Sequence, residues 1–290
     1  MTAPEAPLLQ VDQLRVAFPS PRGVVTAVHD VSLQMGREKV GIVGESGSGK
    51  SITARAILRL LPPYANISAK TINFKGENLL DFSEKELRRI RGRQISMVMQ
   101  DPKYSLNPVR RVGEQIREAY SLHRRVSARQ SRQQTLEMLA AVRIRNPEQV
   151  YNLYPHEVSG GMGQRIMIAM MLIPEPSLLI ADEPTSALDV TVRLQVLAIL
   201  DDLVNQRGMG LIFISHDLEL VASFCDRVII MYGGRVMETL AAGDLHSSQH
   251  PYTRGLINCL PKVQGKRERL PTLERDEAWL TADFQGEVGQ

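Results

Sequence analysis

The sequence predicts an α/β protein built around a parallel sheet, and three features support this fold class. Short apolar runs recur along the chain, each followed by a turn and then by a helical pattern. The runs KVGIVG (39–44), SLLIAD (177–182) and GLIFISH (210–216) are almost continuously apolar, as strands covered on both faces are. The 290 residues, 43% of them hydrophobic, suffice for one large domain or two modest ones.

Helical patterns follow the first run and separate the other two. The segment SITARAILRLL predicts a helix that Pro62 and Pro63 stop. Its apolar face consists of Ile52, Ala56, Ile57 and Leu60. A second predicted helix ends at Gly208. It carries Val190, Leu194, Leu197, Leu200 and Val204.

The remaining segments complete the predicted organisation. LLQVDQLRVAF and VVTAVHDVSLQM resemble strands joined by a PSPRG turn, and Gly233 and Gly234 predict a hairpin within RVIIMYGGRVMETL. Between Ser105 and Val158 the strand pattern vanishes, which predicts a helical subdomain inserted at about 103–172. We therefore expect one domain over residues 8–262 and a polar tail over 263–290 that is a candidate for disorder.

Composition narrows the environment and the partners. Cys225 and Cys259 form neither a CxxC nor a Cys/His cluster, so we expect incidental thiols in a reducing compartment and no metal site on them. The N-terminus lacks the pattern of a secretory signal, and apolar runs such as 166–173 fall short of the about 18 residues of a membrane span. The net charge is only +3, and glutamates interrupt the arginine-rich segment 88–145. A solvated helical face is therefore favoured there over nucleic-acid binding.

The stretch GESGSGKS has the GxxxxGKS spacing of a phosphate-binding loop between a strand and a helix. Glycines let backbone N–H groups surround phosphates, and the helix N-terminus adds a positive field. This chemistry assigns Lys50 to the β- and γ-phosphates and the Ser51 hydroxyl to Mg²⁺. The predicted ATP-binding residues of this region are Gly44, Glu45, Ser46, Gly47, Ser48, Gly49, Lys50, Ser51 and Ile52.

Phosphoryl transfer also requires a carboxylate near the metal and a group that orients water, and SLLIADEP contains both. Asp182, at the end of a predicted buried strand, is a candidate metal ligand, directly or through water. Glu183 is placed to polarise the attacking water. Taken alone, Asp-Glu-Pro would be a strand-end turn, but beside a phosphate loop the catalytic interpretation is favoured.

The order GESGSGKS, MVMQDP, VSGGMGQR, LLIADEP, SALD and ISHD resembles the nucleotide-binding subunits of ABC transporters. The resemblance implies a P-loop (RecA-like) ABC ATPase core with an N-terminal antiparallel β subdomain and an inserted helical subdomain. It implies that Gln100 is a metal and water ligand, that Glu183 is the general base and that His216 contacts the γ-phosphate. Phe18 matches the position at which these proteins stack an aromatic ring on adenine.

In this family two ATPase subunits pair head to tail, so VSGGMGQR would act on the nucleotide of the partner. A serine hydroxyl, backbone N–H groups and a helix start would direct positive partial charge at phosphate. The implied signature residues are Ser159, Gly160, Gly161 and Met162. The implied D-loop residues are Ser186, Ala187, Leu188 and Asp189.

Longer matches, including MQDPKYSLNP and HPYTRGL, resemble the ATPases of dipeptide, oligopeptide and nickel importers over about residues 9–261. The resemblance implies ATP and Mg²⁺ as cofactors and a peripheral position on the cytoplasmic face of the inner membrane. The implied partners are a second, related ATPase subunit, two permease chains and an extracytoplasmic solute-binding protein, with no nucleic acid. Two departures stand out: Gly163 replaces the usual arginine, and the tail lacks the cysteine cluster of many relatives.

Other ABC and P-loop proteins are weaker alternatives. Exporters usually fuse membrane helices to the ATPase, and DNA-repair or translation ATPases add coiled coils, zinc modules or a second cassette. P-loop kinases and GTPases have no use for the SGG segment. A nonhydrolysing subunit is disfavoured because every motif residue is present. The soluble, non-transport ABC ATPase remains the alternative function, and the sequence does not identify the solute.

Overall fold

The computed structural model describes residues 6–100, 105–186, 188–260, 276 and 279, and the chain divides into two compact units. Unit 1 comprises residues 1–80 and 213–290, and unit 2 comprises residues 81–212. Strand β9 (Gly210–Ser215) contains the boundary between the two units.

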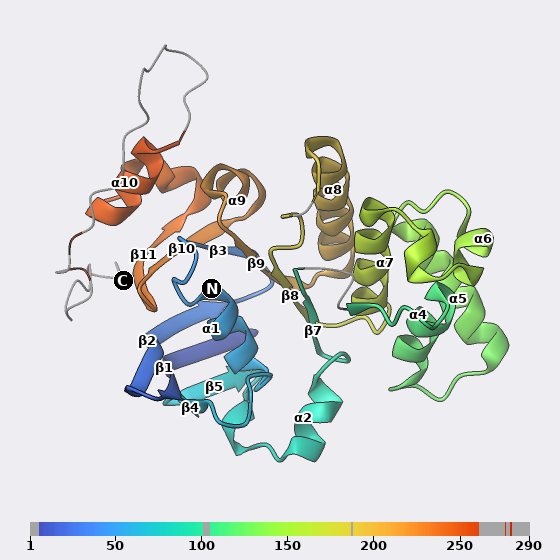
Figure 1. The fold of residues 1–290 in the computed structure, drawn as a ribbon, viewed down its shortest axis with the longest axis horizontal. Coiled ribbons are helices and arrows are strands. Elements are labelled where there is room, and N and C mark those ends of the chain that lie inside the picture. Colours follow the sequence, from blue (N-terminus) through green and yellow to red (C-terminus); the bar gives the residue numbers. More distant parts are fainter. Residues whose placement is uncertain (1–5, 101–104, 187, 261–275, 277–278, 280–290) are drawn as a thin grey trace, which may run out of the picture. The chain divides into compact units, whose positions relative to one another are not determined.

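Unit 1 contains an antiparallel sheet led by the long hairpin of β1 (Leu9–Ser20) and β2 (Gly23–Met35) (Figure 1). The short strands β4 (Asn66–Ser68) and β5 (Thr71–Phe74) also pair with β1, and β6 (Glu77–Asn78) pairs with β5. The predicted N-terminal β subdomain is therefore present. Its first turn is tighter than the predicted PSPRG, because Pro19 and Ser20 still pair with β2.

The parallel part of unit 1 places β10 (Arg227–Tyr232) beside β3 (Lys39–Val43), with β11 (Arg235–Ala241) antiparallel to β10. The predicted hairpin is confirmed: Gly233 and Gly234 have φ of 51° and 78°, as a two-residue turn with left-handed centres requires. Helix α9 (Leu218–Phe224) packs on β3, and α10 (Pro251–Asn258) follows the 3₁₀ turn η3 (Ala242–Ser247).

Helix α1 (Lys50–Ile57) starts at the phosphate loop and packs on β1 and β2. Its predicted extent was too long, because Arg59 adopts a left-handed φ of 50° before either proline is reached. The Leu60 amide donates to the Arg55 carbonyl, which closes the helix end. As a result Leu60 is 45% exposed and does not extend the buried face that Ala56 and Ile57 form.

Unit 2 contains the parallel pair β7 (Ile95–Val98) and β8 (Leu178–Asp182), both buried along their whole length. Helix α2 (Glu84–Ile90) precedes β7 and begins with a capping box between Ser83 and Glu86. Helix α8 (Val190–Arg207) follows β8 and ends at Gly208, as predicted. Its first apolar residues differ from the rest, because Val190 and Leu194 are 69% and 61% exposed.

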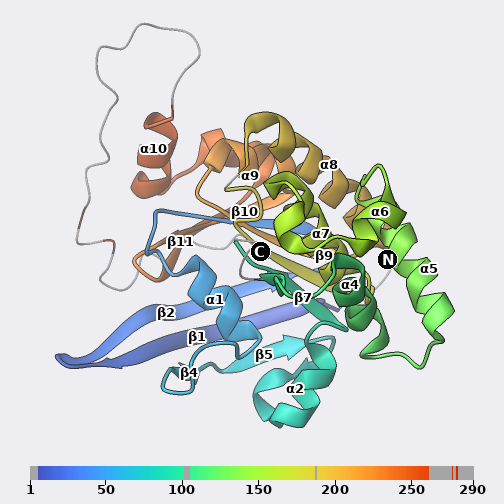
Figure 2. The ribbon, with the colours of Figure 1, turned by 45° about the vertical axis from the view of Figure 1, so that its right-hand side comes forward.

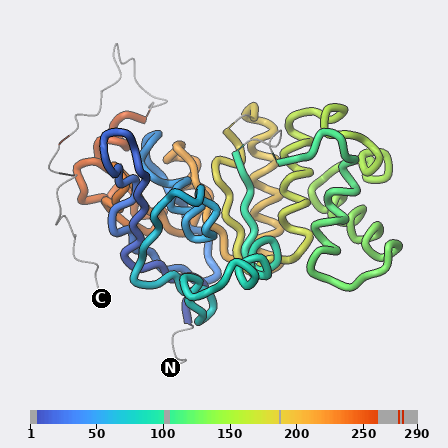
Figure 3. Tube along the Cα trace, turned by 60° about the horizontal axis from the view of Figure 1, so that its bottom comes forward, coloured from blue at the N-terminus to red at the C-terminus, as the bar shows by residue number. Residues whose placement is uncertain are grey.

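Among the described residues, the predicted helical insertion includes the helices α4 to α7 of unit 2 (Figures 2 and 3). They are α4 (Val112–Ser121), α5 (Ala128–Ala141), α6 (Pro147–Asn152) and α7 (Gly160–Leu172). A Cβ on Gly113 would lie 2.1 Å from the Tyr151 ring, so α4 and α6 approach closely only because this residue is glycine. The sequence-based limits of 8–262 and 103–172 for domain and subdomain stay predictions.

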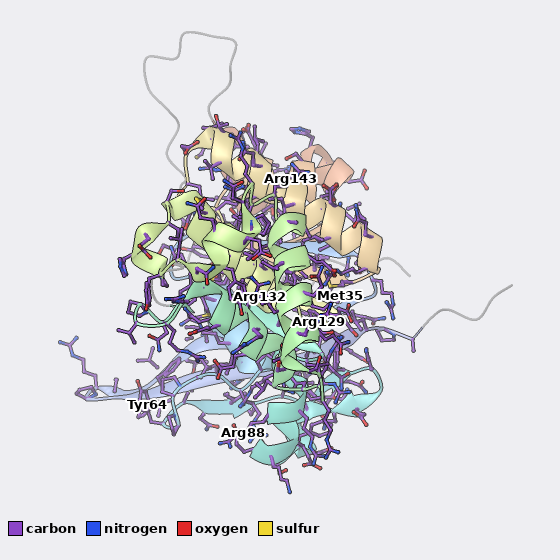
Figure 4. The ribbon with its side chains drawn as sticks, turned by 90° about the vertical axis from the view of Figure 1, so that its right-hand side faces the viewer. Met35, Tyr64, Arg88, Arg129, Arg132 and Arg143 are labelled. Atoms are coloured by element: carbon purple, nitrogen blue, oxygen red, sulfur yellow. The ribbon has the colours of Figure 1, made fainter. Side chains whose placement is uncertain are left out.

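Arginines of the basic segment are paired with carboxylates in unit 2. The Arg124–Glu175 and Arg143–Asp202 pairs have N···O distances of 2.6 and 2.7 Å. Arg132 on α5 pairs with Glu148, and Arg129 projects from the same helix (Figure 4). Interleaved charge of this kind is typical of a solvated helical face.

No helix in the described ranges combines the length and apolar character that a bilayer crossing requires. Of the predicted tail, residues 263–290, only Asp276 and Trp279 lie within the described residues.

Candidate active site

The phosphate loop of unit 1 is held in shape by its own lysine. Lys50 is only 6% exposed, and its Nζ donates to the carbonyls of Gly44 and Glu45 at 2.7 and 2.8 Å. It also donates to Ser48 Oγ at 3.3 Å. The ammonium thus lies inside the loop, within hydrogen-bond distance of the loop's own carbonyl and hydroxyl oxygens.

Glycines give this loop its curvature and its close contacts. Gly47 and Gly49 have φ of 82° and 95°, which side-chain-bearing residues rarely adopt. A Cβ on Gly44 would lie 2.0 Å from the Met231 carbonyl oxygen. The Gly234 amide donates to the Ser48 carbonyl at 3.1 Å, so the β10–β11 turn supports the loop from behind.

The start of α1 suits an anion. Gly49 is its N-cap and provides no side-chain cap, so the first-turn N–H groups are not covered by a capping side chain. Ser46 and Gly47 are exposed at the rim, whereas Ser48, Gly49 and Lys50 are buried. Ser51 and Ile52, the next predicted binding residues, are half-buried in the first turn.

Phe18 lies on β1 opposite Val25 and is half-buried. Its ring is edge-on to Tyr64, with centroids 6.4 Å apart, and both rings belong to unit 1. Tyr64 itself is 65% exposed. An aromatic surface therefore exists at the predicted adenine position, and Tyr64 is a component of it that the sequence alone did not indicate.

His216 follows β9 directly and is exposed. The next residue, Asp217, caps α9 by accepting from the Leu220 amide at 3.0 Å, and its own amide donates to Ser215 Oγ at 3.0 Å. These bonds fix the backbone on both sides of His216 and leave its imidazole at the surface of unit 1.

Unit 2 positions the two predicted catalytic carboxylates at the end of β8. Asp182 is 2% exposed and is the last residue of the strand. Glu183 has a left-handed φ of 48°, a conformation that costs free energy in a residue other than glycine. The Ser186 hydroxyl donates to the Glu183 carbonyl at 3.2 Å and helps to hold this turn.

Gln100, 83 residues before Glu183, is brought to the same carboxylate. Its Nε2 donates to Glu183 Oε2 at 3.2 Å. The structure therefore brings Gln100 together with the predicted general base. The buried Gln164 of α7 adds a bond to the Pro184 carbonyl, a contact that sequence reasoning missed.

The signature segment forms the exposed start of α7. Ser159 is the N-cap, and its Oγ accepts from the Met162 amide at 3.4 Å. A Cβ on Gly160 would meet nothing within 4 Å, whereas one on Gly161 would lie 2.6 Å from Val192 Cγ1 of α8. Gly163 is buried in the same helix, and its amide donates to the Ser159 carbonyl at 2.8 Å.

The D-loop lies between β8 and α8. Ser186 is exposed, and the Leu188 amide donates to the Thr185 carbonyl at 3.2 Å. Asp189 caps α8 by accepting from the Val192 amide at 3.0 Å. Ala187 lies outside the described residues.

The comparisons with known proteins decide the family. Residues 28–186 match the family described as ABC transporter. The chain belongs to this family. The sequence is 49% identical, over 92% of this chain and 81% of the relative, to a probable peptide ABC transporter ATP-binding protein of Sinorhizobium fredii. It is 45% identical, over 94% of this chain and 83% of the relative, to the oligopeptide transport ATP-binding protein OppD of Salmonella typhimurium.

Solved structures agree on the ABC ATPase fold. The dimeric ATP-binding cassette MJ0796 bound to ADP and phosphate superposes with a TM-score of 0.73, at 26% identity, over 81% of this chain and 98% of that chain. CbiO1 of Clostridium perfringens, part of an ABC transporter complex, gives a TM-score of 0.70 at 26% identity over 84% and 92%. This chain is an ATPase subunit of a transporter, and the alternative of a soluble, non-transport ABC ATPase finds no support.

Proposed function

We propose that this ABC ATPase hydrolyses ATP at the phosphate loop of unit 1 to energise the import of peptides, nickel or a related small solute. The observation that carries the proposal is the buried Lys50 ammonium, held on three oxygens inside a glycine turn that opens a helix. ATP phosphates would replace these oxygens as its partners. The peptide and oligopeptide transport proteins among the relatives favour peptides as the solute.

The loop fits an ATP polyphosphate. The first-turn N–H groups of α1 and the Lys50 Nζ offer several donors to one anion, and glycines keep the backbone accessible. The half-buried Phe18 ring would stack on adenine. His216, at the surface of unit 1, would donate to the γ-phosphate.

The oxygen donors of the chain also fit Mg²⁺ carried by a nucleotide. No group of three or more His, Cys, Asp or Glu side chains in the described part of the chain could hold a metal by itself. Mg²⁺ bound with ATP needs only one or two protein carboxylates, because phosphates and water complete its octahedron. Asp182, the Ser51 hydroxyl and the Gln100 amide oxygen would hold the ion, which neutralises charge that develops on the phosphates.

Glu183 would act as the general base. Its carboxylate accepts a proton from the water whose oxygen attacks the γ-phosphorus, while the bond to the bridging oxygen of ADP breaks. The left-handed backbone at Glu183 and the bond from Gln100 orient this carboxylate before substrate binds. The products are ADP and phosphate.

The exposed signature would act on the ATP of a second, related ATPase subunit. Ser159 and Gly160 are exposed, and a Cβ on Gly160 would meet no described atom within 4 Å. The Ser159 hydroxyl and the backbone N–H groups beside it would therefore be accessible to a partner's phosphate. The D-loop residues Ser186, Leu188 and Asp189 would face the same partner, and Ala187 belongs to that segment by sequence. A heterodimer is proposed because importers of this group often pair different ATPases.

The assembly would include two permease chains and an extracytoplasmic solute-binding protein, with this subunit on the cytoplasmic face of the inner membrane. The transport ATP-binding proteins among the relatives support a membrane partner. The ion-paired arginines of unit 2 support a solvated face and no nucleic-acid partner.

The test uses Glu183→Gln in the assembled transporter. We expect ATP binding to persist, hydrolysis to fall by about 10²–10³-fold and the ATPase dimer to stay closed in MgATP. Glu219→Gln, an exposed glutamate on α9, is the matched control and should hydrolyse normally. Normal turnover by Glu183→Gln, or a monomer that opens freely in ATP, would refute the proposed base.

A further inference from the structure

Trp279, one of the described residues of the tail, belongs to an aromatic cluster of unit 1. Its ring centroid lies 5.8 Å from that of Tyr252 and 6.0 Å from those of Tyr232 and His250. The two tyrosines are 4.6 Å apart. The contacts with Trp279 are edge-on, which is a favourable arrangement for aromatic rings.

A hydroxyl of this cluster contacts the phosphate loop. The Glu45 amide donates to Tyr252 Oη at 3.4 Å, a contact between residues 207 apart in sequence. The carbonyl oxygen of Glu45 also accepts a hydrogen bond from the Lys50 ammonium. The position of Tyr252 therefore bears directly on the segment of the loop that contains the lysine's acceptors.

Tyr252 has little freedom to move. It is fully buried, and its amide donates to His250 Nδ1 at 3.1 Å at the start of α10. His250 is 4% exposed, and burial lowers its pKa, which favours the neutral ring that this acceptor role requires. The Trp279 ring packs edge-on against both rings. Tyr232 lies at the end of β10, next to the turn that donates to Ser48.

We propose that Tyr252 and Trp279 are positioning residues for the phosphate loop, with Trp279 fixing the Tyr252 ring so that its hydroxyl holds the Glu45 amide in the ATP-binding conformation. The inference rests on the proposed ATP site at this loop. By reciprocity, bound ATP strengthens the docking of Trp279 to the same degree that docking strengthens ATP binding. Trp279 thus tunes nucleotide affinity through Tyr252 and the Glu45 amide.

A purely structural role for the cluster makes different predictions. In that case the loss of Trp279 lowers the melting temperature but leaves the affinity of the folded chain for ATP unchanged. A positioning role predicts weaker ATP binding with little change in kcat at saturating ATP, because the reacting groups are retained.

The experiment measures MgATP binding to the full chain by titration calorimetry, with Trp279→Ala, Trp279→Phe and Tyr252→Phe. We expect about fivefold weaker binding for Trp279→Ala and for Tyr252→Phe, and recovery of most of the affinity in Trp279→Phe. In the Tyr252→Phe background, Trp279→Ala should cost less than about twofold, because the connecting hydroxyl is already gone. Full additivity of the two changes, or unaltered affinity in Trp279→Ala, would overturn the proposal.

A second measurement needs no change at the cluster. Trp279 is the only tryptophan of the chain, so intrinsic fluorescence reports on this position alone. ATP should shift the emission of the otherwise unchanged chain, and Lys50→Ala should abolish the shift. An emission spectrum that ATP does not alter, in a chain that binds ATP, overturns the coupling and leaves the proposed ATPase function intact. Absence of ATP binding by the unchanged chain refutes both.

Discussion

The phosphate loop of unit 1 and the signature of unit 2 are both glycine-rich turns at helix starts, yet they are built differently. The phosphate loop is enclosed: Lys50 is buried on three acceptors, and Gly44 lies against the Met231 carbonyl. The signature is open: Ser159 is exposed, and a Cβ on Gly160 would meet nothing. This difference agrees with the proposed roles, in which the phosphate loop binds ATP on its own chain and the signature presents its donors at the surface to a partner's ATP.

The largest effect should come from the enclosed loop. Lys50→Ala removes the only side-chain cation that the loop places on its own backbone oxygens in the described structure, so we expect ATPase activity to fall by about 10³-fold. A phosphate-release assay on the assembled complex measures this. Lys85→Ala, an exposed lysine on α2, is the matched control and should retain full activity. Equal activity of the two variants would remove the loop from the mechanism.

Alanine substitutions at Gly44 and Gly160 test whether the phosphate loop is enclosed and the signature is open. Gly44→Ala should lower the free energy of unfolding by about 3 kcal/mol, because its Cβ would lie 2.0 Å from a backbone oxygen that cannot rotate away. Gly160→Ala should change stability by less than about 0.5 kcal/mol. It should nevertheless slow hydrolysis at the partner's nucleotide by about 10²-fold, since the methyl group displaces phosphate from the Ser159 donors.

Denaturant unfolding and single-site ATPase measurements check this pair of variants. The contrast between an enclosed loop and an open signature is wrong if Gly160→Ala destabilises the fold as strongly as Gly44→Ala does. The proposed action of the signature on a partner's nucleotide is wrong if Gly160→Ala leaves hydrolysis at the partner's site unchanged.

A smaller effect should arise where the signature helix meets α8. Gly161→Ala brings a Cβ to 2.6 Å from Val192 Cγ1, so a side chain must give way, and we expect a loss of about 1–2 kcal/mol in stability. Val192→Ala removes the obstructing methyl, so the double variant should be more stable than additivity predicts. A double-mutant cycle by thermal or denaturant unfolding measures the coupling; zero coupling would mean that the two helices separate to accommodate the change.

The phosphate loop and the strand-end Asp-Glu pair could be predicted from sequence. Each is a contiguous pattern, and the local backbone fixes its geometry. Asp182 at the end of a buried strand is an example. The end of α1 could not be predicted from its prolines, since Arg59 adopts a left-handed conformation first. The contact of Tyr252 with Glu45 depends on packing between distant segments, and only the HPYT stretch marked its position.

The smallest effect concerns the packing of Cys225 near β3, the strand that precedes the phosphate loop. Cys225 ends α9 near β3, and burial, aided by the charge of Asp226, raises the pKa of its thiol from 9.0 to about 12. An acid whose pKa is raised on folding contributes its full stabilisation below the unfolded pKa and loses this contribution progressively as pH rises from the unfolded pKa to the folded pKa. The free energy of unfolding should therefore fall by about 1 kcal/mol between pH 8 and 10 through this group.

Urea unfolding of the unchanged chain and of Cys225→Ala at both pH values isolates the contribution. Cys225→Ala loses packing at every pH, so its lower stability is not informative by itself. The informative result is a smaller fall in its free energy of unfolding between pH 8 and 10 than in the unchanged chain. Cys259→Ala, at the half-buried end of α10, should decline as the unchanged chain does. If the free energy of unfolding of Cys225→Ala falls equally between pH 8 and 10, water reaches the Cys225 thiol in the folded chain, and the packing around β3 is less enclosed than the burial of Cys225 indicates.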